Sequence, residues 1–436
     1  MSELDVWMNG ELVATWHDGR GASTLTYHRS WLESPRCRSL SLSLPITEAL
    51  TVQGPRVRNF FDNLLPDNDR IRRRLRRRFG VRTDEVIDLL EAIGRDCVGA
   101  VQLLPPHEAP SGFDKLSYRT LSEQEVAQLL RNVTSDGPLL QEPDEDDFRV
   151  SIAGTQEKTA LLKLGEQWCA PHGATPTSHI LKLPLGVIGG RVGMLMTVEN
   201  EWLCMQLLGA LGLPVAATEI VQFEEQKALA VTRFDRLSME DGAWLARLPQ
   251  EDFCQATATA ANRKYENDGG PGVERCMQLL AGSSTPDLDK ERFLLGQLAF
   301  WMLAATDGHA KNFSIFLERG DGYVATPLYD VISMWPIIGN EPMELYRGKV
   351  KMAMAIRSTR AHYAMDTIMP RHWAEKADAS GIAHMRKSMR MLAEGVEPAI
   401  EAVAARLPKD FPMRIWDAIT GGLRGQSRAF LAGFPH

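Results

Sequence analysis

The residues best suited to chemistry lie within six positions, 307–312, which hold an acid, an imidazole, an amine and an amide. The acid, Asp307, precedes the amide, Asn312, by five residues, which is the spacing of the catalytic-loop aspartate and the metal-binding asparagine in protein kinases. A second acid, Asp330, follows a short polar turn. These are the minimal polar groups for phosphoryl transfer from a magnesium-bound nucleotide. The alternative is an ordinary loop whose polar residues cap neighbouring elements.

This loop follows an apolar run at 293–303 that is typical of a buried helix. Strands dominate before about residue 235, whereas long apolar runs predict helices beyond residue 249. The predicted helices cover 276–280, 292–305, 374–379, 384–407 and 411–423. The acid-bearing loop is therefore expected where a buried helix ends, within the helical half of the chain.

A lysine upstream of this loop lies in an apolar strand. Lys182 is the single charged residue within the strand predicted at 179–184. Kinases place a lysine on a central strand to contact nucleotide phosphates; an edge-facing or ion-paired lysine is the alternative. Glu201, in a helix predicted for 197–211, could pair with Lys182, whereas Glu199 more simply favours the positive end of the helix dipole.

Two turns near this lysine could contact a nucleotide through their backbone. Residues 151–158 form a small-residue turn before a strand at 159–164, and such a turn can direct N–H groups at phosphates. It lacks the G-x-x-x-x-G-K pattern, so an ordinary hairpin is the simpler interpretation. Residues 232–236 leave a strand at 228–232, either as a hinge whose backbone faces adenine or as a strand end with surface charges.

The N-terminal region predicts a small β-rich module. Strands at 6–8 and 11–16 flank Asn9-Gly10, which is a strong signal for a two-residue hairpin turn. Strict alternation at 40–44 predicts a half-buried strand.

An arginine-rich helix is predicted from Asp67, as its cap, to Phe79. It offers a surface for nucleic acid or an acidic partner, or else a solvated face anchored by its apolar residues. The arginines are Arg70, Arg72, Arg73, Arg74, Arg76, Arg77 and Arg78.

Length and composition exclude several classes of protein. A length of 436 residues predicts two or three lobes, and a net charge of -7 argues against a protein that coats nucleic acid unaided. The six cysteines form no C-x-x-C pair, so neither a zinc site nor a disulfide framework is indicated. The sequence shows no signal peptide's apolar core and no apolar run of membrane-spanning length, so we expect a cytoplasmic protein without a membrane partner.

Several motifs together resemble the HipA family of bacterial serine/threonine kinase toxins. They run in order over nearly the whole chain, at 60–67, 151–162, 180–184, 233–236, 248–252, 268–272, 305–314, 329–330 and 370–372. The resemblance implies an α+β, two-lobed, protein-kinase-like fold. Its expected parts are a β-rich N-terminal subdomain (1–145), a kinase-like N-lobe (146–248) and an all-helical C-terminal lobe (249–436).

The resemblance also implies roles for individual residues. Asp307 would accept the proton of the substrate hydroxyl, Asn312 and Asp330 would hold Mg2+, and Lys182 would contact the ATP phosphates. The phosphate loop would comprise Ala153, Gly154, Thr155, Gln156, Glu157 and Lys158. The adenine hinge would comprise Thr232, Arg233 and Phe234. Other residues beside the nucleotide would be His309, Ala310, Lys311, Tyr329 and Asp330.

Ser151 matches the serine that members of this family autophosphorylate, which ejects the phosphate loop and silences the enzyme. A phosphate adds about -1.5 to -2 charge. Placed beside a loop that must receive ATP phosphates, it would oppose nucleotide binding by repulsion of like charges and by loss of loop geometry.

The resemblance further implies a HipB-like helix-turn-helix antitoxin, with which the chain would repress its own operator DNA, mainly through the antitoxin. The implied substrate is an aminoacyl-tRNA synthetase, notably glutamyl-tRNA synthetase, with growth arrest and persistence as the outcome. The stretch 347–360 is basic but differs from the lysine-rich stretch of the family, which leaves direct DNA contact open.

Two other hypotheses remain. The chain could be a catalytically silent corepressor that acts only through its antitoxin, although such a module has no need for the set Lys182, Asp307, Asn312 and Asp330. A kinase for a small molecule or a lipid would use the same phosphate chemistry, and only the resemblance disfavours it.

Overall fold

The computed structural model describes residues 2–19, 22–134, 156–185, 196–341 and 344–435. The chain divides into two compact units. The first comprises Met1–Leu183, Val221–Arg263 and Ile315–Tyr323, and the second comprises Pro184–Ile220, Lys264–Ser314 and Val324–His436. The predicted segments 1–145 and 146–248 therefore share one unit, except that residues 184–220 belong to the other.

The first unit is built on two large sheets. Its strands are β1 (Ser2–Met8), β2 (Glu11–Gly19), β3 (Ala22–Tyr27), β4 (Thr51–Gln53), β5 (Val101–Leu104), β6 (Tyr118–Thr120), β7 (Lys158–Leu164), β8 (Gln167–Pro171), β9 (His179–Lys182), β10 (Thr218–Phe223) and β11 (Gln226–Thr232). The sheet orders are β4-β3-β2-β1-β5 and β10-β11-β9-β7-β8-β6. A hairpin of β12 (Arg236–Met239) and β13 (Trp244–Arg247) follows the second sheet.

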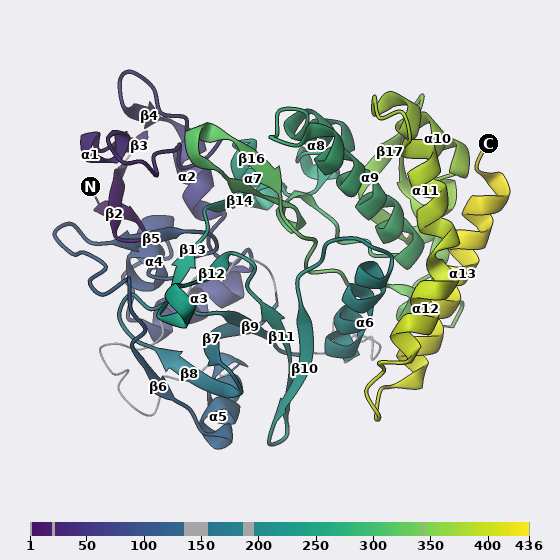
Figure 1. Ribbon diagram of the computed structural model, residues 1–436, viewed down its shortest axis with the longest axis horizontal. Helices are drawn as coiled ribbons and strands as arrows, with labels where there is room; N and C mark the ends of the chain where they lie inside the picture. Colours follow the sequence, from purple (N-terminus) through teal and green to yellow (C-terminus); the bar gives the residue numbers. More distant parts are fainter. Residues whose placement is uncertain (1, 20–21, 135–155, 186–195, 342–343, 436) are drawn as a thin grey trace. The chain divides into compact units, whose positions relative to one another are not determined.

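The first unit also contains short helices (Figure 1). They are α1 (Arg29–Leu32), α2 (Pro55–Asp62), α3 (Asp69–Arg78), α4 (Val86–Ile93), α5 (Glu123–Thr134) and α7 (Phe253–Ala256). Helices α2 and α4 bury the first sheet, where the Trp16 ring stacks on Phe61 with centroids 4.0 Å apart. Helix α5 packs on β7 and β11 of the second sheet. Each sheet thus has its own apolar core.

Local turn chemistry decides which of the N-terminal predictions are correct. Asn9 and Gly10 take φ values of 45° and 81°, and β1 and β2 form the predicted hairpin. The predicted strand at 40–44 is wrong, because the Leu44 N–H bonds the Ser41 carbonyl at 3.0 Å and closes a turn. This turn buries Leu40 and Leu44, so the alternation reflects burial without a strand.

The second unit is mainly helical. Its helices are α6 (Thr197–Ala210), α8 (Val273–Leu280), α9 (Pro286–Leu303), α10 (Pro370–Ala379), α11 (Met385–Glu394), α12 (Val396–Ala404) and α13 (Met413–Gly433). Helix α13 packs against α9, α10, α11 and α12 (Figure 1). The single helix predicted at 384–407 is two helices, because the chain breaks at Gly395. None of the described helices has both the length and the apolar character needed to cross a bilayer.

The fold is α+β, as predicted, but the region beyond residue 249 is not wholly helical. A three-stranded sheet contains β14 (Gln250–Asp252), β15 (Ser314–Leu317) and β16 (Tyr323–Ala325), and a hairpin contains β17 (Lys351–Arg357) and β18 (Ala361–Ala364). These strands are short and lie outside the ranges predicted as helices.

Five buried charged side chains join the N-terminal part of the first unit to the segment that follows β11. Asp96 accepts hydrogen bonds from Arg233 Nη1 (3.3 Å), Arg236 Nη2 (2.9 Å) and Arg247 Nε (3.1 Å). Asp235 accepts from Arg233 Nη2 at 2.8 Å. Burial alone would raise the pKa of Asp96, but Arg236, Arg233 and Arg247 together hold it well below its usual range. We call this set the arginine–aspartate cluster.

Glu251 is another buried acid in this unit. Its Oε1 accepts the Leu42 N–H at 2.9 Å. Burial raises the pKa of Glu251 to about 8; the Leu42 hydrogen bond opposes this shift and the neighbouring Asp252 adds to it. The side chain is therefore mostly neutral in the folded protein near pH 7.

Removing one partner of the arginine–aspartate cluster should destabilise the fold. Asp96→Asn leaves three buried arginines with one aspartate, and breaking such a buried pair costs about 3–5 kcal/mol. We expect the urea midpoint of unfolding to fall accordingly. Asp84→Asn, at an exposed position, is the matched control and should leave the midpoint unchanged. An unchanged midpoint for Asp96→Asn would show that the cluster does not hold this unit together.

Glu251 should make stability depend on pH. Because its folded pKa is raised, its contribution is fully present below the unfolded value and is lost as pH rises through about 8. Glu251→Gln mimics the neutral acid and should stabilise the protein at pH 9 by up to ~4 kcal/mol relative to wild type, with little change at pH 5. Thermal unfolding at both pH values checks this, with the exposed Glu48→Gln as control. An equal effect at both pH values would contradict it.

Candidate active site

The candidate acid loop begins where α9 ends. Ala304 caps this helix in the left-handed conformation, with φ 50°, and so turns the chain out of the helix. The Asp307 carbonyl then accepts two hydrogen bonds, from His309 N–H at 2.7 Å and from Asn312 Nδ2 at 2.8 Å. The Asp307 side chain is 57% exposed, whereas Asn312 is buried. The five-residue spacing thus closes a turn that presents one acid to solvent.

Close packing holds this loop against its helix. A Cβ at position 308 would lie 2.6 Å from Phe300 Cδ2, so only glycine lets the loop approach the helix. His309 and Lys311 are both buried within the loop. The loop is therefore built as a compact turn in which its acid is the exposed charged group.

Tyr329 connects the loop to the second acid. Its Oη donates to the Lys311 carbonyl at 2.8 Å and shares a hydrogen bond of 2.6 Å with Ser314 Oγ. The next residue, Asp330, has a φ of 61°. Left-handed backbone at a residue other than glycine is uncommon, and such strain often marks functional sites. Because Tyr329 precedes it, Asp330 is held close in sequence to a residue that is anchored to the loop of Asn312.

Asn312 and Asp330 have the donor atoms that Mg2+ prefers. Because Asn312 Nδ2 donates to the Asp307 carbonyl, the amide is oriented with Oδ1 as its remaining acceptor. Within the described parts of the chain, no group of three or more His, Cys, Asp or Glu side chains could hold a metal by itself. Mg2+ usually takes one or two protein groups together with waters and substrate phosphates. The two residues fit a cation that arrives with a nucleotide.

Two further sets of contacts in this unit are not evident from sequence patterns. Tyr265 Oη donates to Asp307 Oδ1 at 2.5 Å. Asn200 Nδ2 donates to the Ser333 carbonyl and Asn200 Oδ1 accepts its N–H, both at 2.8 Å, while Ser333 Oγ bonds the Leu303 carbonyl at 2.6 Å. Asn200 thereby fixes the segment after Asp330. A polar residue near the start of a helix gives no signal of such a partner.

In the first unit, Lys182 occupies a central strand, as predicted. Strand β9 lies between β11 and β7, where Lys182 is opposite Leu229 and Lys158, and its side chain is buried. The strand also anchors the end of the predicted phosphate loop, because Gln156 Nε2 donates to the Leu183 carbonyl at 2.5 Å. Glu201 belongs to the other unit, so the Lys182–Glu201 pair stays a prediction.

Other predicted site residues lie outside the described residues. Ser151 and the first half of the predicted phosphate loop, Ala153, Gly154 and Thr155, belong to this group. Gln156, Glu157 and Lys158 complete the predicted loop and are described.

Of the three predicted hinge residues, one has a side chain with structural partners and the other two are more accessible. Arg233 N–H donates to the Ser178 carbonyl at 2.9 Å, and its guanidinium belongs to the arginine–aspartate cluster. Thr232 ends β11 and is exposed, and the Phe234 ring meets Phe316 edge to face at 5.8 Å. Arg233 thus has a structural role, and the expected adenine contact rests on Thr232 and Phe234.

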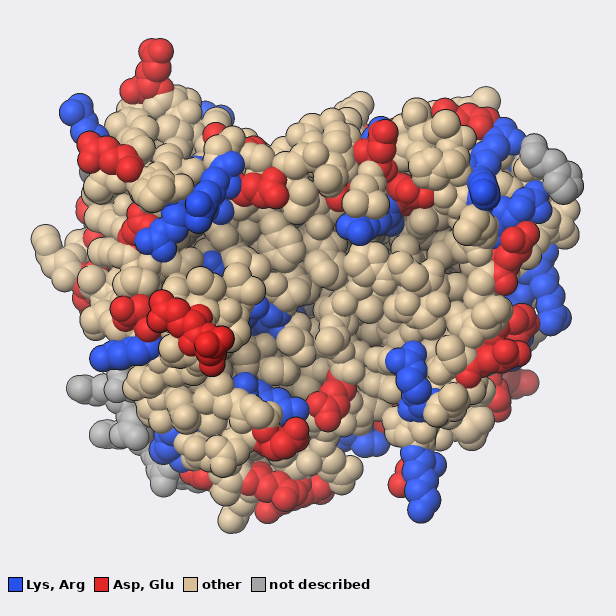
Figure 2. All heavy atoms as spheres, viewed as in Figure 1, with Lys and Arg blue, Asp and Glu red and all other residues tan. Residues whose placement is uncertain are grey.

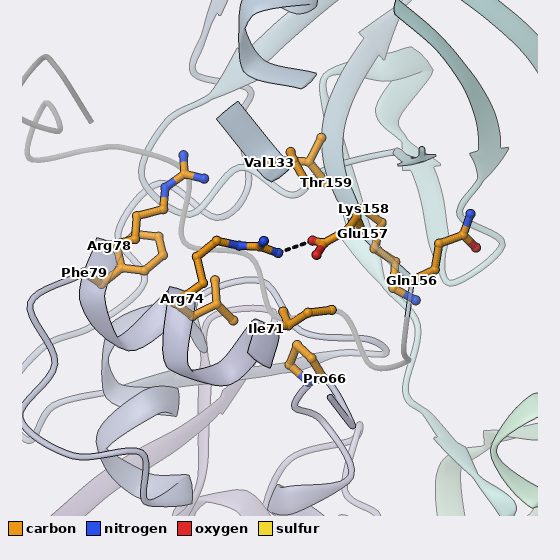
Figure 3. Close-up of a pocket in the computed structure, with 11 residues that line it drawn as sticks. Pro66, Ile71, Arg74, Arg78, Phe79, Val133, Gln156, Glu157, Lys158 and Thr159 are labelled. Atoms are coloured by element: carbon orange, nitrogen blue, oxygen red, sulfur yellow. Dashed lines mark hydrogen bonds and ion pairs between the residues drawn. The ribbon is translucent and has the colours of Figure 1, made fainter. Parts of the chain in front are cut away.

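The arginine-rich helix is partly structural. Helix α3 is capped by Asn68, which accepts from Arg70 N–H at 2.8 Å, and not by the predicted Asp67. Arg74 is buried and forms an ion pair with Glu157 across a small pocket of about 90 Å³ (Figure 3). Arg72 pairs with Asp62 at 2.7 Å. The Arg74 pair ties α3 to the end of the predicted phosphate loop, and the Arg72 pair ties it to the end of α2. The exposed arginines of this helix are Arg70, Arg73, Arg76 and Arg77.

Comparison with known proteins gives two family matches that together span most of the chain. Residues 4–104 match the HipA N-terminal domain, and residues 150–410 match the HipA-like C-terminal domain. Y4mE of Sinorhizobium fredii, named as a kinase, is 31% identical over 404 residues, which cover 92% of this chain and 91% of Y4mE. The serine/threonine-protein kinase toxin HipA of Shewanella oneidensis is 28% identical over 71% of this chain and 69% of that protein.

A solved structure has the same fold. The HipA chain in a complex of Shewanella oneidensis HipA, HipB and operator DNA aligns with a TM-score of 0.80 at 24% identity, and the match covers 99% of this chain and 98% of that chain. With both family matches and this fold, the chain belongs to the HipA family.

Proposed function

We propose that this protein is an ATP- and Mg2+-dependent protein serine/threonine kinase. One observation carries the proposal. The turn at 307–312 exposes the Asp307 carboxylate, and it buries the Asn312 amide, whose Nδ2 donates to the backbone carbonyl of Asp307. A loop that only caps neighbouring elements has no need to combine an exposed acid with an oriented amide oxygen. The relatives named as kinases support the same activity.

The residues of the second unit would act on the acceptor and on the metal. Asp307 takes the proton of the substrate hydroxyl as that oxygen forms a bond to the γ-phosphorus, while the bond from phosphorus to the ADP oxygen breaks. Asn312 Oδ1 and the Asp330 carboxylate would hold Mg2+, which neutralises charge on the phosphates when bound. No covalent enzyme intermediate is needed.

The residues of the first unit would bind the rest of the nucleotide. Lys182 is a buried cation on a central strand, and such a lysine suits the nucleotide phosphates. Gln156 and Glu157 fix the end of the phosphate loop to the Leu183 backbone. Thr232 and Phe234 would supply the backbone groups that face adenine.

The proposal extends to the toxin activity of the family. The Shewanella oneidensis relative is named a serine/threonine-protein kinase toxin. We propose an aminoacyl-tRNA synthetase as the protein substrate, glutamyl-tRNA synthetase first, with arrest of translation, growth arrest and persistence as the result. We also propose that autophosphorylation of Ser151 silences the enzyme, because a phosphate there would repel the phosphates of ATP.

A HipB-like helix-turn-helix antitoxin and operator DNA are the proposed partners. The support is the solved relative, which is in a complex with HipB and operator DNA. The net charge of this chain is -7, and basic and acidic side chains are interspersed on the face shown in Figure 2. This charge distribution favours DNA contact mainly through the antitoxin.

The alternative function, a corepressor without catalysis, would differ in one respect: it would not bind ATP with Mg2+ in a titration.

Loss of the exposed acid should abolish transfer. Asp307→Asn keeps the size of the side chain but removes the proton acceptor, so we expect phosphate transfer from labelled ATP to fall by about 10²–10⁴-fold. Asp417→Asn, an exposed substitution on α13, is the control and should transfer normally. Phosphoproteomics after brief expression of each variant would identify the substrates. Undiminished transfer by a folded Asp307→Asn protein would refute the proposed activity.

Loss of the second acid should change the metal requirement. Asp330→Asn removes one charged ligand, so the Mg2+ concentration for half-maximal transfer should rise by about 10–100-fold, with partial recovery at high Mg2+. A titration with MgCl2 at saturating ATP measures this. If the half-maximal concentration stays the same and only the maximal rate falls, Asp330 does not hold the cation.

A further inference from the structure

The polar segment Lys264–Gly272 has no role that its sequence predicts, yet it borders the acid loop on two sides. Tyr265 Oη donates to Asp307 Oδ1 at 2.5 Å, and its ring meets the His309 ring edge to face, with centroids 5.0 Å apart. The Lys264 carbonyl accepts the Ala310 N–H at 3.3 Å. One segment therefore contacts the carboxylate, the imidazole and the backbone of the same loop.

The residue after Tyr265 anchors this segment to the β17 strand. Glu266 is mostly buried; its Oε2 accepts the Ala355 N–H at 2.7 Å, and its Oε1 accepts Arg357 Nε at 3.0 Å. Gly272 makes room for this carboxylate, because a Cβ there would lie 2.3 Å from Glu266 Cδ. Glu266 thus fixes the backbone next to Tyr265.

The glycine-rich turn that follows fixes the Tyr265 backbone itself. The Tyr265 carbonyl accepts the N–H groups of Asp268 at 3.0 Å and Gly270 at 2.9 Å. Gly269 permits this turn with φ 93°. The Asp-Gly-Gly-Pro-Gly stretch is therefore explained as a support for one tyrosine side chain.

We propose that Tyr265 is a positioning residue for the phosphoryl-transfer acid, an inference that rests on the proposed kinase activity. Its hydroxyl holds Oδ1 of Asp307, so that Oδ2, 4.0 Å from His309 Nε2, is the oxygen that receives the substrate proton. Tyr265 keeps its own proton throughout the reaction and does not touch the transferred phosphate. Its effect is to restrict an exposed carboxylate to one orientation.

Tyr265→Phe tests this directly, because it keeps the ring against His309 and removes only the donor. We expect the single-turnover rate of self-phosphorylation at saturating labelled ATP to fall about 10–100-fold, as for a lost hydrogen bond to a charged group. The ATP concentration for half-maximal rate should change less than twofold. Tyr346→Phe, which removes a hydroxyl from an exposed tyrosine of the same unit, is the control and should behave as wild type.

The other outcomes separate this inference from the proposed activity. An unchanged maximal rate for Tyr265→Phe overturns the positioning role. A fall in rate that comes with a lower melting temperature and a higher ATP concentration for half-maximal rate also overturns it, because a structural role alone would produce that pattern. If Asp307→Asn still transfers phosphate, the proposed activity itself fails, whatever Tyr265→Phe does. If Asp307→Asn is inactive and Tyr265→Phe is normal, only the positioning role is lost.

Discussion

The backbone carbonyl of Asp307 is the point on which the candidate site depends. It accepts hydrogen bonds from the Asn312 amide and the His309 N–H. These bonds fix the acid relative to Asn312, the proposed metal ligand, before a substrate binds. A single neutral hydrogen bond contributes only about 1 kcal/mol to stability. Its importance here is therefore orientation, since groups held in place need not reorganise when charge moves in the transition state.

In the first unit, buried charged side chains hold the residues beside the predicted hinge in place. Three arginines and two aspartates are buried together, which is tolerable only because each has partners. Asp96 lies just before β5 of the N-terminal sheet, whereas Arg233 directly follows the predicted hinge residue Thr232. The N-terminal subdomain is therefore part of the support for the hinge and not an appended module. A change in that subdomain that moves Asp96 should therefore also move the predicted hinge residues that follow β11.

The sequence predicts those features that depend on neighbours along the chain. The Asn9-Gly10 hairpin, the lysine on β9 and the turn between Asp307 and Asn312 all follow from local pattern and spacing. Features that depend on distant partners do not: Arg233 and Asp96 are 137 residues apart, and Tyr265 precedes Asp307 by 42 residues. The sequence therefore does not predict that the Arg233 guanidinium lies in the arginine–aspartate cluster, and the place of its backbone beside the nucleotide stays a prediction. Tyr265 gives no signal in the sequence. The proposed substrate and partners follow from the likeness to the family and its members, and not from any local pattern.

The choice of tyrosine beside Asp307 has a physical reason. A lysine or arginine at position 265 would also hold Oδ1, but it would bring a positive charge that pairs with the carboxylate and competes with the substrate hydroxyl for it. A phenol donates one directed hydrogen bond and adds no net charge at neutral pH. It can therefore fix one oxygen and leave the negative charge to act at the other. The rigid support that Glu266 and the glycine turn provide fits this interpretation, because a neutral donor orients its partner only if its own position is fixed.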